Sequence, residues 1–84
     1  KVNVTLSAEA ASNLESLSNP IHGRVLKLLV RLQQWPNVSG AKPLAAGLAG
    51  CYRLRTGDYR LQFHVAGDVV VVEKIGHRDG FYED

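Results

Sequence analysis

Arginines recur at alternate positions in the C-terminal half of the sequence. Arg53 and Arg55 are separated by one residue, Arg60 follows closely, and Asp58 is the only acid between Lys42 and Arg60. A planar guanidinium group can bond two oxygens of one phosphate. Like charges that lie together on a sheet destabilise it unless an anion joins them. These residue types at this spacing therefore predict a site that binds phosphate.

Further basic and aromatic residues follow these arginines. His64 belongs to the same alternating segment as Arg60, and the others lie nearer the C-terminus: Lys74, His77, Arg78 and Tyr82. Single-stranded RNA requires positive charge for its phosphates and flat surfaces on which its bases can stack. The composition fits an RNA-binding face. A row of arginines is also common on a solvated sheet surface, and spacing alone leaves both interpretations open.

Period-two alternation predicts the strands that would position these side chains. Apolar and polar residues alternate over 2–6, over 51–55 and over 59–65, and residues 69–72 are a continuous run of valine. The second and third segments flank a short turn at 56–58, which predicts a β-hairpin. The valine run is typical of a strand that is covered on both faces or central in its sheet.

Two amphipathic helices are expected between the first and second strands. Ser7 is placed to cap the first helix, which should end near Ser18, and Asn19 followed by Pro20 is a typical start for the second. Apolar residues then recur at helical spacing as far as residue 32, and the Trp-Pro pair at 35–36 stops the helix. A neighbouring face of this helix carries a row of basic residues: Arg24, Lys27 and Arg31.

The predicted order is β-α-α-β-β-β, an α+β fold in which an antiparallel sheet carries a helical hairpin on one face. A chain of 84 residues is long enough for one core and too short for two, so residues 1–84 are expected to form a single domain. Because side chains alternate between the faces of a strand, the three arginines of the hairpin and His64 would share the face without helices.

Composition and the single cysteine indicate the general class of protein. The chain is 45% hydrophobic with a net charge of +2, as in an ordinary globular protein. Cys51 alone cannot form an intramolecular disulfide, no metal-ligand cluster is visible, and no cofactor is expected. No histidine stands at a spacing that suggests a Cys–His pair, so Cys51 is expected to be a small, partly buried residue. No membrane-spanning run or signal peptide is visible, which favours a cytoplasmic protein.

From Leu48 onward the sequence resembles the C-terminal half of the RelE/ParE toxin superfamily. The shared pieces are a Tyr-Arg-x-Arg strand (52–55), a Gly-Asp-Tyr-Arg hairpin (57–60), a β-branched strand (69–75), Gly-His-Arg (76–78) and Tyr82. The β-α-α-β-β-β order matches as well. The resemblance implies a RelE-like fold and a toxin of a type II toxin–antitoxin system.

RelE-type members cleave mRNA on the ribosome, and the resemblance implies that this chain is such a metal-independent endoribonuclease. The positions that match the RelE-type site are Arg53, Arg55, Arg60, Arg78 and Tyr82. The implied reaction is attack of a ribose 2′-OH on the adjacent phosphate. Arg53 and Arg60 would stabilise the pentacoordinate phosphate, Arg78 would act at the leaving oxygen, and Tyr82 would accept the 2′-OH proton or stack on a base.

One departure from the family pattern affects these roles. The first hairpin strand carries lysines in the well-studied form, whereas here both positions are arginine. Arginine stays protonated, so Arg53 and Arg55 suit phosphate binding better than proton transfer. His77 is a possible acid–base group, although strand alternation turns it away from Arg78. The basic row on the second helix is either a solvated face or a contact for ribosomal RNA.

Two alternative functions are also compatible with the resemblance. ParE-type members inhibit DNA gyrase without nuclease activity, and an inactive relative would only bind its antitoxin and operator DNA. The resemblance also implies the partners: a small, acidic, partly disordered antitoxin, the ribosome and mRNA, and operator DNA through the toxin–antitoxin complex. A membrane is not expected among them.

Overall fold

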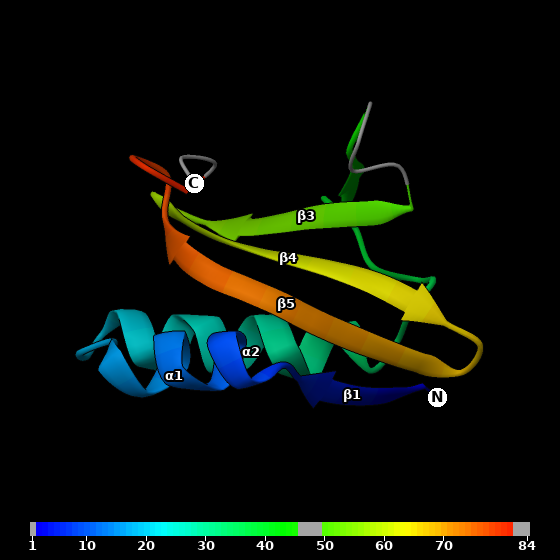
Figure 1. Cartoon of the computed structure of the whole chain (residues 1–84), viewed down its shortest axis with the longest axis horizontal. Coiled ribbons are helices and arrows are strands. Elements are labelled where there is room, and N and C mark those ends of the chain that lie inside the picture. The colour runs from blue at the N-terminus through cyan, green and yellow to red at the C-terminus, as the bar shows by residue number, and fades with distance from the viewer. Residues whose placement is uncertain (1, 46–49, 82–84) are drawn as a thin grey trace.

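The computed structural model describes residues 2–45 and 50–81 of the chain. Its elements are β1 (Asn3–Leu6), α1 (Ala8–Ser16), α2 (Ile21–Leu32), β2 (Lys42–Pro43), β3 (Cys51–Thr56), β4 (Tyr59–Ala66) and β5 (Val69–His77). Figure 1 shows both helices along one side of the long, twisted β3–β4–β5 sheet. The predicted α+β class and the order of the long elements are confirmed. In the part of the chain that is described, no helix is long and apolar enough to cross a membrane.

The sheet has the order β1-β5-β4-β3-β2. The β3–β4 and β4–β5 pairs are antiparallel hairpins whose turns contain Gly57 and Gly67, both with positive φ. The valine run is central, as predicted, because β5 lies between β4 and β1. The first strand departs from the expected antiparallel arrangement: β1 pairs parallel to β5, since the two helices return the chain to the end where β1 started.

Beyond the end of β1, the α1 helix lies along the edge of β5 in place of a strand. Ser7 caps the helix as predicted, since its Oγ accepts the Ala10 N–H at 3.0 Å, and the same Oγ donates to the Glu73 carbonyl at 2.8 Å. Further along α1, Asn13 Oδ1 accepts the Ile75 N–H at 3.0 Å. These bonds satisfy backbone groups of β5 that have no strand beside them, and they fix the second half of β5 in place.

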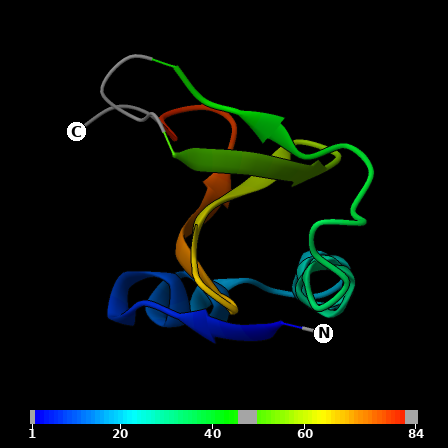
Figure 2. The same cartoon turned by 90° about the vertical axis from the view of Figure 1, so that its right-hand side faces the viewer.

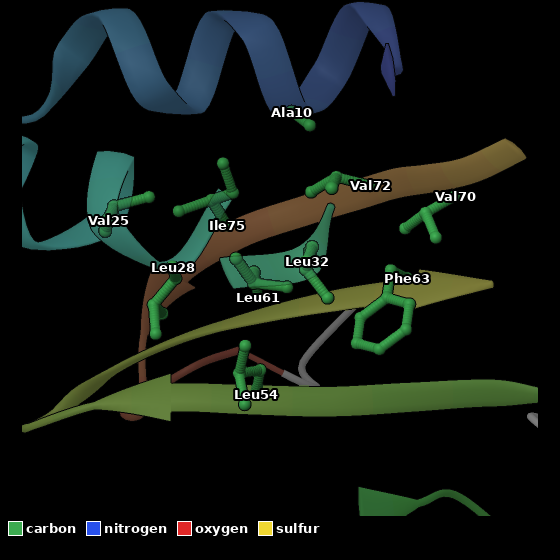
Figure 3. Close-up of a cluster of buried hydrophobic side chains, with 10 residues drawn as sticks. All are labelled: Ala10, Val25, Leu28, Leu32, Leu54, Leu61, Phe63, Val70, Val72 and Ile75. Atoms are coloured by element: carbon green, nitrogen blue, oxygen red, sulfur yellow. The ribbon is translucent and has the colours of Figure 1, made fainter. Parts of the chain in front are cut away.

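The core lies between α2 and the helix-facing side of the sheet. Its members are Ala10, Val25, Leu28, Leu32, Leu54, Leu61, Phe63, Val70, Val72 and Ile75, each at most 5% exposed. Figure 3 shows these side chains converging from both helices and from β3, β4 and β5, and Figure 2 shows α2 end-on at one side of the sheet. Because one face of each strand is committed to this core, the alternate residues must point to the other face.

Two local expectations differ from the structure. Pro20, not Asn19, is the N-cap of α2, and no side chain bonds the cap, so the second helix begins without the expected Asn cap. The helix ends at Leu32, before the Trp35-Pro36 pair, which follows in a turn. The short strand β2 is an addition, since the loop composition around Pro43 gave no strand signal.

Candidate functional site

Arg53, Arg55 and Arg60 share the sheet face opposite the core, as their spacing predicted. They alternate with Leu54 and Leu61, which are 2% and 0% exposed on the core side. The β3–β4 register places Arg55 directly opposite Arg60 and Arg53 directly opposite Gln62. We call this sheet face, formed by residues 51, 53, 55, 60, 62, 64, 73 and 74, the arginine face.

A row of polar side chains extends the arginine face to a fourth strand, β2. Lys42 on β2 pairs with Arg53, Arg53 pairs with Gln62, and Gln62 on β4 pairs with Lys74 on β5. Paired residues in neighbouring strands point to the same face. Lys42 therefore joins the site although the sequence gave no reason to include it, because β2 is only two residues long and contains Pro43.

Arg60 is half-buried on the arginine face. Its Nε atom is buried and has no hydrogen-bond partner among the described residues. Gly76 is opposite Arg60 in register, and a Cβ on Gly76 would lie 3.4 Å from the ring of Phe81, which is 4% exposed. Phe81 therefore covers the sheet beside Arg60, and Lys74 Nζ lies 4.6 Å from the centre of the Phe81 ring. Sequence patterns did not single out Phe81.

The described residues place no carboxylate within ion-pair distance of Arg53, Arg55 or Arg60. A carboxylate does lie at the other end of the arginine face, where Glu73 Oε2 is 2.7 Å from His64 Nδ1 and Glu73 Oε1 accepts from Gln62 Nε2 at 2.9 Å. Partial burial raises the pKa of Glu73, but hydrogen bonds from Gln62, His64 and Cys51 outweigh it and hold the pKa below its ordinary value. His64, predicted as an RNA contact, is thus bound to Glu73.

Cys51 differs from its expected surroundings. It is half-buried, as predicted. A histidine does lie beside it, however, because the β3–β4 register places Cys51 opposite His64. Its Sγ donates to Glu73 Oε1 at 3.5 Å. Burial, the Glu73 charge and this hydrogen bond all raise the pKa of the Cys51 thiol, so the group is a neutral thiol and a poor nucleophile.

The other predicted catalytic residues are partly brought to the arginine face. The Arg78 N–H donates to the Asp58 carbonyl at 2.7 Å, which ties the residue to the turn that joins Arg55 and Arg60. Its guanidinium is within 3.9 Å of Asp58 and 3.6 Å of Asp79 carboxylate oxygens, so its charge is shared with two exposed acids. Tyr82 lies outside the described residues.

His77 points to the helix side of the sheet, as alternation predicted. Its ring makes an edge contact with Tyr59, with ring centres 5.1 Å apart, and its Nδ1 accepts the Asp79 N–H at 3.0 Å. It lines a shallow pocket of about 210 Å³ between α1 and the loop after β5, whose wall also includes Glu9, Asn13 and Phe81. This pocket does not include the arginines, so His77 is not grouped with them.

The basic row on α2 is separate from the arginine face. Arg24, Lys27 and Arg31 are exposed on the helix that packs on the opposite side of the sheet (Figure 2). Arg31 also has a structural contact, because its Nη2 donates to the Ser39 carbonyl at 2.6 Å and holds the segment after α2. A ligand on the arginine face could not reach this row without wrapping around the molecule.

One family model and several solved structures match this chain. A family model described as "ParE toxin of type II toxin-antitoxin system, parDE" matches residues 4–80. No curated protein matches the chain. Among solved structures, the chain is similar to one in the RelBE2 toxin–antitoxin complex of Mycobacterium tuberculosis, with 26% identity, a TM-score of 0.79, and 92% and 91% of the two chains covered.

Two further structures have the same fold. The isolated RelE toxin of Escherichia coli is 21% identical with a TM-score of 0.77, over 92% of this chain and 84% of that one. A YoeB/ParE toxin of Agrobacterium tumefaciens is 16% identical with a TM-score of 0.75, over 89% of this chain and 96% of that one. These likenesses confirm the RelE-like architecture expected from the sequence.

Proposed function

The chain belongs to the ParE family of toxins of type II toxin–antitoxin systems, and we propose that it acts as a ribosome-dependent mRNA endonuclease. The observation that carries this proposal is the arginine face. Arg53, Arg55 and Arg60 lie together there without an acidic partner among the described residues, and the Nε of Arg60 is buried with an unused donor. A phosphodiester would supply the missing charge and the missing acceptor.

The proposed reaction is a transesterification within the RNA. The ribose O2′ forms a bond to the adjacent phosphorus, the bond from phosphorus to O5′ breaks, and the products are a 2′,3′-cyclic phosphate and a 5′-OH. Arg53 and Arg60 would hold the negative oxygens of the pentacoordinate transition state, which is the largest contribution that such a site makes. Arg55 would neutralise a neighbouring phosphate, and Arg78, at the same end of the sheet, would stabilise the leaving oxygen.

Tyr82 keeps two proposed roles, as proton acceptor for the 2′-OH or as a ring on which a base stacks. The row of Lys42, Gln62 and Lys74 would extend the phosphate contacts across the sheet. His64 and Lys74 remain proposed RNA contacts, and the α2 row is proposed to contact ribosomal RNA. His77, turned to the other side of the sheet, is the weakest of the proposed acid–base groups.

Cleavage of translated mRNA tests the proposal directly. A reporter message is translated in a cell-free system with purified toxin, and primer extension locates new 5′ ends on ribosome-bound RNA. Arg60→Ala is expected to lower the cleavage rate about 100-fold or more, the usual loss when a donor to transition-state charge is removed. Glu15→Ala, at an exposed position of α1 with no proposed RNA contact, is the control and is expected to cleave like wild type. Uncut message with the wild-type toxin would reject the nuclease.

The family description itself favours a second candidate, a gyrase inhibitor without nuclease chemistry. The matching family model is the one for ParE toxins, over residues 4–80. In that case the arginine face would bind a protein or DNA surface and no bond would break. Inhibition of DNA supercoiling by purified gyrase, with translated mRNA left intact, would support this candidate over the first.

We further propose that a cognate antitoxin covers the arginine face. A toxin–antitoxin complex is among the similar structures, and the face carries basic side chains from four strands. A small, acidic, partly disordered peptide would complement this charge, and the complex would bind operator DNA. Purification of the tagged toxin from cells that also express the neighbouring reading frame should recover an acidic protein. Recovery that is equally efficient with Arg53→Glu would count against binding at this face.

A further inference from the structure

Glu73 and His64 form an oriented pair on the arginine face. The Glu73 Oε2 atom is 2.7 Å from His64 Nδ1, and Gln62 Nε2 holds the other carboxylate oxygen at 2.9 Å. A carboxylate beside one ring nitrogen of histidine fixes the proton on that nitrogen. The neutral ring then has its proton on Nδ1 and a free electron pair on Nε2. His64 and Glu73 side chains are 37% and 33% exposed, so the pair is held by the sheet but is accessible.

A β-bulge creates this pair. The β4–β5 register is continuous up to Phe63 opposite Val72 and resumes with Gln62 opposite Lys74, which leaves Glu73 as the extra residue on β5. A bulge of this kind changes the direction of a side chain, and such bulges are common beside active sites. Without it, simple alternation after the buried Val72 would place Lys74 on the core side. With it, both Glu73 and Lys74 lie on the arginine face.

The pair lies next to an arginine that is proposed to hold phosphate. Cys51 is opposite His64 and Arg53 is opposite Gln62, so Arg53 is the diagonal neighbour of His64 across the β3–β4 ladder. Long side chains in diagonal positions are within reach of each other. A phosphate bound by Arg53 would therefore bring its ribose close to the imidazole.

We propose that His64, positioned by Glu73, is the general base that removes the proton from the attacking ribose 2′-OH. This inference rests on the nuclease function proposed above and assigns a step that the arginines cannot perform, because guanidinium groups remain protonated. His64 is the catalytic residue of the pair. Glu73 is a positioning residue that acts through the ring, and Gln62 steadies the carboxylate.

The step balances within the RNA and water. The proton of the 2′-OH moves to His64 Nε2 as O2′ bonds to phosphorus, and the bond from phosphorus to O5′ breaks. The leaving O5′ takes a proton from a water molecule, and the imidazolium returns its proton to the resulting hydroxide. No oxidant, reductant or external nucleophile is required. Tyr82 is then left with the stacking role.

Titratable and charged groups from three strands surround His64 on the arginine face. Glu73 and Lys74 come from β5, Cys51 and Arg53 come from β3, and Arg60 is on the same strand. A general base must be unprotonated, so the cleavage rate of the wild-type toxin should rise with pH and then level off once the imidazole is neutral.

The test is single-turnover cleavage of a translated reporter mRNA across a pH series. His64→Ala and His64→Gln are expected to slow cleavage by about 100-fold or more and to remove the rise with pH. Added imidazole should restore a measurable part of the rate to His64→Ala, because the small base can enter the vacated space. His22→Gln, the same change on α2, is the matched control and should keep the wild-type rate and profile. Glu73→Gln should lower the rate less than His64→Ala and displace the pH profile.

The outcomes separate this inference from the function on which it rests. If the wild-type toxin cleaves and His64→Ala cleaves equally fast, the assignment of the base is overturned while the nuclease stands. If the wild-type toxin does not cleave, both fall. A nitrogen NMR measurement on the wild-type protein guards against misfolded variants: the neutral His64 ring should carry its proton on Nδ1, and a proton on Nε2 would also overturn the proposal.

Discussion

Arg55 and Arg60 lie directly opposite each other in the antiparallel β3–β4 ladder, and both point away from the core. Opposed like charges on neighbouring strands cost stability, and no carboxylate among the described residues offsets this pair. The free toxin therefore holds a repulsive pair that an anionic ligand would relieve. This relationship leads to a prediction that does not depend on which activity the toxin has.

Arg55→Gln is expected to stabilise the free protein. Removing one of the two opposed charges should raise the free energy of unfolding by about 0.2–1 kcal/mol at low ionic strength. The gain should diminish at high salt, because the repulsion between exposed charges is then screened. Urea unfolding at low and high salt measures both quantities. Lys27→Gln, on the exposed face of α2, is the control. An Arg55→Gln protein that is less stable than wild type at low salt would contradict the argument.

Phe63→Ala is expected to remove a large part of the stability of the fold. The Phe63 side chain is 0% exposed, and its ring contacts Trp35 and Tyr52 at centre distances of 5.2 and 5.5 Å. Truncation of a buried phenylalanine costs about 3–5 kcal/mol, out of a total of about 5–15 kcal/mol for a typical domain. Thermal or urea unfolding measures the loss.

The matched control for the core is Leu26→Ala. Leu26 is 41% exposed on the outer side of α2, so its truncation leaves no cavity. Its effect should stay within about 0.5 kcal/mol of wild type, as for most surface substitutions. Equal losses at Phe63 and Leu26 would mean that the core is not where the structure places it.

Sequence patterns predicted the arginine face because alternation is a local property. Once Leu54 and Leu61 are committed to the core, Arg53, Arg55 and Arg60 must point the other way, whatever the rest of the chain does. The two-residue turn at Gly57 also follows from local preferences. The general fold and the arginine cluster could therefore be predicted from residue types and their spacing.

The residues that surround the arginine cluster could not be predicted in the same way. Glu73 reaches His64 only because a bulge interrupts the β4–β5 register, and no residue pattern marked it. Lys42 joins through a strand of two residues, and Phe81 covers Gly76 after the chain has left the sheet. Each of these contacts depends on strand register or on the path of the chain after β5. Local residue types and spacing determine neither.

Ser7→Ala tests the junction between β1, α1 and β5. Ser7 Oγ bonds the Ala10 N–H and the Glu73 carbonyl, so one substitution removes a helix cap and an edge contact of β5. Loss of an N-cap alone costs about 0.5–2 kcal/mol, and the expected loss lies in the upper half of that range because a second bond is broken. Urea unfolding is the measurement. Ser16→Ala, which removes only an exposed bond to the Asn13 carbonyl, should change little.

The lowered pKa of Glu73 predicts a specific dependence of stability on pH. A carboxyl whose pKa is lower in the folded state than its ordinary value of 4.5 favours the folded state when it is ionised. Its contribution is therefore present above that value and is lost as the pH falls through the lower pKa of the folded protein. Protonated Glu73 has no charge, so its hydrogen bond from Gln62 is weaker and the charge-assisted contact with His64 is lost.

The measurement compares wild type with Glu73→Gln in urea unfolding at a series of pH values. The wild type should be the more stable protein above pH 4.5, and the difference should shrink steadily as the pH falls below it. Glu15→Gln, at an exposed position of α1, removes a carboxyl without these contacts and should run parallel to wild type through the same range. A difference between wild type and Glu73→Gln that stays constant down to low pH would show that the Glu73 charge contributes nothing to the fold. The bulge would then serve another purpose than holding this carboxylate against His64.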